Sequence, residues 1–68
     1  MIEKLQNAGF MVVTSNNGYT IHKGIHSLKI KALDTDSLSG YKLKGIHTEK
    51  YQKEHNEFVE QIRKLINN

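Results

Sequence analysis

The chain has 68 residues, no cysteine, no proline and a formal net charge of +3. We expect one small domain over residues 1–68, which buries only about 60% of the surface that its unfolded form exposes. The absence of cysteine excludes disulfides, thiolate metal ligands and a cysteine nucleophile. The sequence shows no secretory signal and no apolar run near the roughly 20 residues of a membrane span, so we expect a cytoplasmic protein.

The first third of the chain predicts a short helix and then a β-hairpin. Ile2, Leu5 and Ala8 have the spacing of one helical face, and Gly9 can cap that helix at its C-terminus. Residues 10–14 form an apolar, β-branched run, and residues 19–22 form a second strand-like run. The Ser-Asn-Asn-Gly sequence between the two runs has strong turn chemistry, which indicates a hairpin.

The middle third predicts one further strand and favours another. Residues 26–32 alternate, with leucine, isoleucine and alanine turned inward and serine and two lysines turned outward, which is typical of a half-buried strand. Residues 34–40 are polar and predict a loop or a single helical turn. Residues 41–44 alternate again and favour a fourth strand at an edge of the sheet.

The last third predicts a long amphipathic helix. Thr48 is a good N-cap, and Glu49 complements the helix dipole. His55 lies in the middle of the apolar stripe, and we interpret it as a ring at the margin of the core with one nitrogen hydrogen bonded. The alternative is a titrating switch or an acid–base group. The stripe itself consists of Tyr51, Phe58, Val59, Ile62, Leu65 and Ile66.

Together these elements predict an α+β fold with the order α–β–β–β–(β)–α. We expect a single antiparallel sheet of three to four strands, with a short N-terminal helix and a long C-terminal helix packed on one face. The second face of the sheet would then be open to solvent.

The excess positive charge lies in residues 19–47. This segment has five lysines and two aspartates, whereas the five basic and five acidic residues elsewhere cancel. A local basic surface attracts polyanions, so we predict a small binding module, not an enzyme, that binds nucleic acid through a lysine-bearing sheet face. Lys29, Lys31, Lys42 and Lys44 alternate onto this face, opposite the core. The alternative is that these lysines keep a small sheet soluble and its edges unpaired. The candidate nucleic-acid-binding residues are Lys23, Lys29, Lys31, Lys42, Lys44, His22, His26 and His47.

The tetrapeptide Lys-Gly-Ile-His occurs twice, at residues 23–26 and 44–47. The first copy joins two predicted strands and the second leads into the last helix, so the repeat does not indicate a duplicated domain. It marks two glycine-allowed chain reversals that bound the basic segment.

The histidines do not predict a metal site, and no cofactor is expected. His22 and His26 are four residues apart, which aligns two ligands on a helix but not in a strand and turn. Residues 34–36 begin like a calcium loop, but Leu38 stands where an oxygen ligand belongs.

Two rival functions stay open. The first is a protein-interaction module, such as a phage or mobile-element inhibitor or regulatory subunit, which would use the open sheet to bind a partner or to form a homodimer. The second is a ribonuclease that uses His22, His26 or His47 for acid–base chemistry beside lysines.

The ribonuclease alternative rests partly on a resemblance. The segment Leu5-Gln6-Asn7-Ala8-Gly9-Phe10 resembles the first helix and strand entry of HicA-type toxin ribonucleases, and the α–β–β–β–α order is similar to that of the double-stranded RNA-binding fold, which they share. The resemblance covers about ten residues. The family's glycine and histidine motif on the second strand is not matched, because His22 comes too late after Gly18, and the proline before the last helix is absent.

Overall fold

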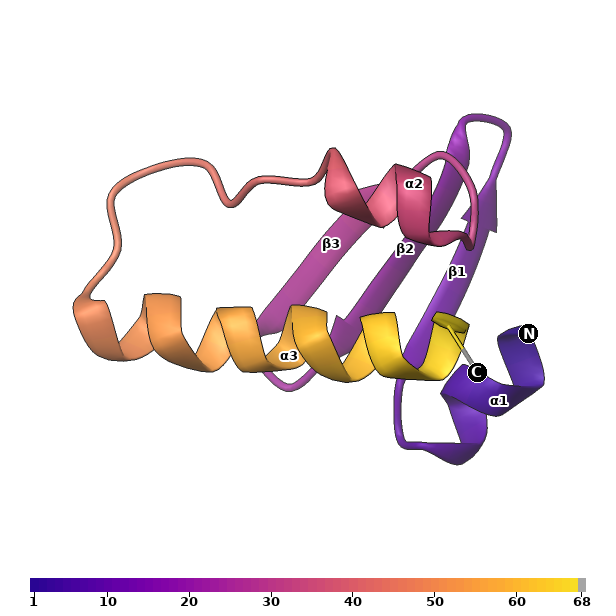
Figure 1. Ribbon diagram of the computed structural model, residues 1–68, viewed down its shortest axis with the longest axis horizontal. Helices are drawn as coiled ribbons and strands as arrows, with labels where there is room; N and C mark the ends of the chain where they lie inside the picture. Colours follow the sequence, from indigo (N-terminus) through magenta and orange to yellow (C-terminus); the bar gives the residue numbers. More distant parts are fainter. Residues whose placement is uncertain (68) are drawn as a thin grey trace.

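The computed structural model describes residues 1–67, which form three helices and three strands. In chain order these are α1 (Ile2–Asn7), β1 (Met11–Ser15), β2 (Gly18–Lys23), β3 (His26–Ile30), α2 (Thr35–Ser39) and α3 (Glu49–Asn67). The strands make one antiparallel sheet in the order β1-β2-β3, and α3 crosses one face of it (Figure 1). The predicted α+β fold, with a short first helix and a long last helix, is confirmed.

The two hairpin turns rely on glycine at different places. In the first, Gly18 has φ of 136° and starts β2, while Asn16 and Asn17 stay out of the left-handed region. In the second, Gly24 has φ of 61° at the first position of a two-residue turn between Lys23 and His26. A glycine at that position is the requirement of a type II′ hairpin turn, whose twist matches the flanking strands.

The expected fourth strand does not form in the described residues. The side chain of Asp34 accepts a hydrogen bond of 2.7 Å from the Ser37 backbone N–H and caps α2, which buries Leu38. The backbone N–H of Tyr41 then donates to the carbonyl of Leu38 at 3.1 Å. This short helix directs the chain away from the edge of β3, so residues 41–44 do not pair with it, and β3 itself ends at Ile30 rather than at the expected Ala32.

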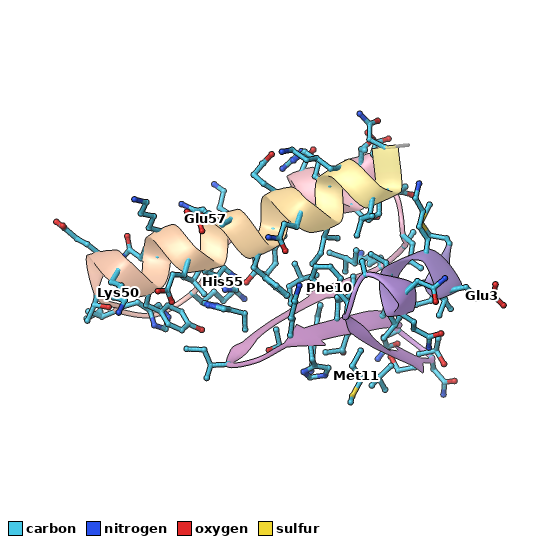
Figure 2. All side chains as sticks on the ribbon, turned by 90° about the horizontal axis from the view of Figure 1, so that it is seen from below. Glu3, Phe10, Met11, Lys50, His55 and Glu57 are labelled. Carbon is cyan, nitrogen blue, oxygen red and sulfur yellow. The ribbon has the colours of Figure 1, made fainter. Side chains whose placement is uncertain are left out.

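One hydrophobic core lies between the sheet and the helices. Figure 2 shows Phe10 between α3 and the sheet, and its ring centroid is 5.8 Å from that of Phe58. The apolar stripe of α3 faces this core as predicted, and the Tyr51 N–H donates to the Thr48 hydroxyl at 3.1 Å, which confirms the N-cap. The buried apolar residues are Leu5, Phe10, Ile21, Leu28, Ile30, Leu38, Phe58, Ile62 and Ile66.

The other face of the sheet is exposed. Met11 lies beside His22 in the strand register, and Val13 lies beside Thr20. Met11 points away from α3 in Figure 2. Among residues 1–67, no helix combines the length and the apolar character needed to cross a membrane.

Candidate functional site

Four of the predicted lysines gather around the free edge of β3. Lys29, Lys42 and Lys44 line one surface hollow, and Lys31 joins Lys29 in the adjoining hollow, which Asp36 also lines. All four side chains are exposed. We call these four residues, Lys29, Lys31, Lys42 and Lys44, the lysine edge.

The lysine edge differs from the sequence prediction in how it is built. Lys29 is on β3, but Lys42 and Lys44 are on the connection between α2 and α3, which lies beyond β3 in Figure 1. The cationic surface therefore follows an edge of the sheet and the adjacent connection. Lys29 is in register with Thr20 and so belongs to the open sheet face, whereas Lys42 and Lys44 lie on the connection, because the strand that would have carried them onto that face does not form.

Two other predicted residues lie apart from the lysine edge. Lys23 is at the end of β2, where its Nζ sits 4.7 Å from the centroid of the Phe10 ring. His22 is on the exposed sheet face next to Met11. His22 and His26 therefore project from opposite faces of the sheet, so the three histidines predicted for acid–base chemistry do not form a single site.

The remaining histidines meet in a compact cluster at the start of α3. We call His26, Tyr41, His47, Tyr51 and His55 the histidine–tyrosine cluster. His55 is at its centre and is only 1% exposed, although it is a polar residue in a predicted apolar stripe. Its Nδ1 lies 3.0 Å from Nδ1 of His26, and its Nε2 lies 2.5 Å from the Tyr41 hydroxyl. Both ring nitrogens are thus hydrogen bonded, against the single bond expected from the sequence.

The contact between the two Nδ1 atoms restricts how many protons the pair can hold. A hydrogen bond between them needs one proton, carried by either His26 or His55. If both rings were doubly protonated, two N–H groups would face each other across 3.0 Å. Burial lowers the pKa of His55, and charge on His26 and then on His47 lowers it further. The pair is therefore built for the neutral state of His55.

Tyr41 closes the other end of this network. Burial raises the pKa of its hydroxyl, and the neighbouring Tyr51 adds to the effect. The hydroxyl therefore keeps its proton at neutral pH and can donate to Nε2 of His55. Tyr41 also lines two hollows that contain residues of the lysine edge. The hydrogen bond to His55 therefore holds in place a residue that lies next to these lysines.

The two Lys-Gly-Ile-His copies converge on one ring. The centroid of the Tyr51 ring is 4.8 Å from that of His26 and 4.5 Å from that of His47. His47 stacks on Tyr51, and its Nε2 is 2.9 Å from the Lys44 carbonyl oxygen within the same repeat. The repeat thus places one histidine on each of two chain segments that pack against α3.

Four ring nitrogens of the histidine–tyrosine cluster already make hydrogen bonds. Nδ1 of His26 and Nδ1 of His55 are bonded to each other, and Nε2 of His55 is bonded to Tyr41. Within residues 1–67 no group of three or more histidine, cysteine, aspartate or glutamate side chains is placed to hold a metal ion.

The outward face of α3 carries charges of both signs. Three glutamates and Lys53 line a shallow hollow there, and Figure 2 shows Glu57 pointing away from the sheet. Over its whole length α3 has four glutamates and four lysine or arginine residues, so it contributes no net charge, and the excess positive charge belongs to residues 19–47. The glutamates that line the hollow are Glu49, Glu57 and Glu60.

Sequence reasoning placed His55 on the apolar stripe but missed its partners. Tyr51 and His55 are four residues apart on α3, and this spacing puts neighbours on one side of a helix. That signal was readable in the sequence. The contacts with His26 and Tyr41 were not, because 29 and 14 residues separate them from His55.

Removing the Tyr41 hydroxyl should destabilise the fold. Tyr41→Phe leaves Nε2 of His55 buried without its partner, so we expect a loss of about 1 to 2 kcal/mol in the free energy of unfolding. Urea denaturation followed by circular dichroism measures it. Tyr19→Phe is the matched control, since no hydrogen bond of the Tyr19 side chain is found among residues 1–67, and it should change stability by less than about 0.5 kcal/mol. Equal losses in both variants would contradict the network.

Comparison with known proteins identifies no relative: no family model matches the chain, and neither a curated protein nor a solved structure matches it.

Proposed function

We propose that this protein binds nucleic acid through the lysine edge. The observation that carries the proposal is the gathering of Lys29, Lys42 and Lys44 around one hollow, with Lys31 beside it. Lys29 is on β3, Lys31 directly follows it, and Lys42 and Lys44 come from a connection more than ten residues later, so the fold brings together charges that are separate in the sequence.

The chemistry of the lysine edge suits a phosphate backbone. Lysine ammonium groups contact phosphate oxygens and release condensed counterions, which makes affinity strongly dependent on salt. With four lysines, the slope of log affinity against log salt would reach roughly −3 to −4 on duplex DNA. Contacts of this kind carry no base sequence, so the binding should show little sequence preference.

The position of the lysine edge also sets the orientation of the bound nucleic acid. A polyanion is attracted by the lysine edge, whereas α3 has equal numbers of acidic and basic residues and so no net charge to attract it. Docking with the β3 side toward the nucleic acid keeps Glu57 and its neighbours in solvent.

The test compares two double variants with the same change of net charge. Lys42→Ala with Lys44→Ala should weaken binding at least tenfold and lower the salt slope by roughly 2. Lys50→Ala with Lys53→Ala, exposed positions on α3, should leave affinity within about twofold. Fluorescence anisotropy with labelled duplex DNA and duplex RNA, titrated at several salt concentrations, gives both quantities.

Two results would reject the proposal. The first is the absence of salt-sensitive binding to either nucleic acid. The second is an equal loss in the two double variants, because the effect would then follow total charge instead of the lysine edge.

A further inference from the structure

The two edge strands of the sheet differ in how well they are protected against pairing with a strand of another chain. β2 is the central strand, so β1 and β3 are the edge strands of the described sheet. Lys29 lies on β3 and Lys31 follows it, whereas β1 contains no charged residue. Lysine on an edge strand discourages pairing with another chain. The edge of β1 lacks this protection.

β1 also exposes apolar side chains and backbone groups. Met11 is 64% exposed and Val13 is 47% exposed. Outside the sheet's own ladder, none of the backbone hydrogen bonds found among residues 1–67 involves β1. In an antiparallel pair every second residue turns its N–H and C=O away from its partner strand. β1 therefore presents unpaired donors and acceptors along a β-branched, uncharged edge.

We propose that two copies of this chain associate by antiparallel pairing of β1 with β1. A two-fold axis at Val13 places Val13 opposite its own copy, Val12 opposite Thr14, and Met11 opposite Ser15. The pairing joins two three-stranded sheets into one sheet of six strands. It leaves the lysine edges of both copies at the outer ends of that sheet.

A second copy fits this edge because the strand is complementary to itself. No charge on β1 faces a like charge in the paired arrangement, and β-branched residues opposite each other stabilise antiparallel strands. The same operation on the β3 edge would bring lysines together, which is unfavourable. The two-fold axis is perpendicular to the sheet, so the helices of both copies stay on one side and the exposed faces on the other.

The proposed β1–β1 interface is small, so we expect a weak dimer. Two five-residue strands bury less than the roughly 1,200 Å² of a standard interface. The dimer should therefore dissociate with a Kd of roughly tens of micromolar. Because backbone hydrogen bonds and apolar contacts hold it, added salt should not weaken it, unlike binding at the lysine edge.

The first test measures association with and without charge on the edge. Sedimentation equilibrium from about 5 µM to about 1 mM should show the wild-type chain passing from monomer to dimer. Val13→Lys should raise the Kd at least tenfold. Thr20→Lys adds the same charge to the same face on β2, in register with Val13, and should leave the Kd within about twofold.

The second test is disulfide cross-linking, which does not need a variant that weakens the dimer. The chain has no cysteine, so a single introduced thiol reports one position. Directly opposed residues in an antiparallel pair have Cα atoms about 4.5 to 5.5 Å apart, within the range of a disulfide. Val13→Cys should form a disulfide-linked dimer at least tenfold faster than Thr20→Cys under the same oxidant.

A chain that stays monomeric to about 1 mM would overturn the proposal. So would a dimer that survives Val13→Lys, or equal cross-linking rates for the two thiols. None of these results bears on the lysine edge, because the lysine variants leave β1 unchanged.

Discussion

Acidification from pH 7.5 to pH 5 is expected to lower the free energy of unfolding of this protein. The folded chain lowers the pKa of His55, whereas an unfolded histidine titrates near pH 6.5. Below about pH 6.5 the unfolded chain therefore binds more protons than the folded one, and stability falls as the pH falls. One extra proton in the unfolded state corresponds to a slope of up to about 1.4 kcal/mol per pH unit.

The measurement is urea denaturation at fixed protein concentration across this pH range, followed by circular dichroism. His55→Gln should flatten the slope, because the titrating group is gone. His22→Gln, on the exposed sheet face, should keep the slope of the wild type. Parallel slopes in the wild type and in His55→Gln would contradict a role for this residue.

Titration of Asp34 falls outside the pH range of this test. Hydrogen bonds from the backbone and side chain of Ser37 lower the pKa of Asp34 below its usual 3.8. A carboxylate with a lowered pKa stabilises the fold above its unfolded value and loses that effect as the pH falls toward its folded value. The Asp34 window therefore lies below pH 3.8, beneath the range measured for His55.

Replacing Gly18 by alanine is expected to cost about 2 to 4 kcal/mol. Two separate effects combine at this position. Its φ of 136° is a conformation that residues with a side chain rarely adopt, and a Cβ there would lie 2.3 Å from the Ile30 carbonyl oxygen and 2.9 Å from Cα of Lys31. Both neighbours are backbone atoms of the β3 segment, so relief requires a shift of the strand.

Gly40→Ala provides the matched control in the same denaturation experiment. Gly40 has an ordinary φ of −81°, and a Cβ there would meet the Ser37 carbonyl oxygen at 3.7 Å, which is normal van der Waals contact. Its effect should stay below about 0.5 kcal/mol. If Gly18→Ala proved as mild as Gly40→Ala, the close approach between β2 and β3 would not exist in solution.

The elements that sequence reasoning predicted correctly are those with a local signal. Three such signals depend only on neighbours within a few residues. They are the alternation of apolar and polar residues in β3, the Ser-Asn-Asn-Gly turn and the apolar stripe of α3 with its 3.6-residue period. The N-cap at Thr48 is local in the same sense. Strand ends moved by one or two residues, because pairing partners rather than composition decide where a ladder stops.

Of the three to four strands predicted, three form within residues 1–67, and the optional fourth had local alternation as its only support. Residues 41–44 alternate in polarity, but burial of Leu38 and the cap at Asp34 form α2 and turn the chain away from β3. Alternation describes a half-buried surface of any extended segment, whether or not a neighbouring strand pairs with it. The position of Lys42 and Lys44 depended on that outcome.

The sequence by itself determined the fold class, the confinement of the excess charge to residues 19–47 and the amphipathic character of α3, since each is a property of residue types and their spacing. Tertiary structure alone decided that the lysines gather at an edge and that His55 bonds to both His26 and Tyr41. It also brought the two repeat histidines to Tyr51. The physical reason is that these contacts join segments whose approach depends on sheet pairing, on α2 and on packing against α3, and no local pattern encodes those distances.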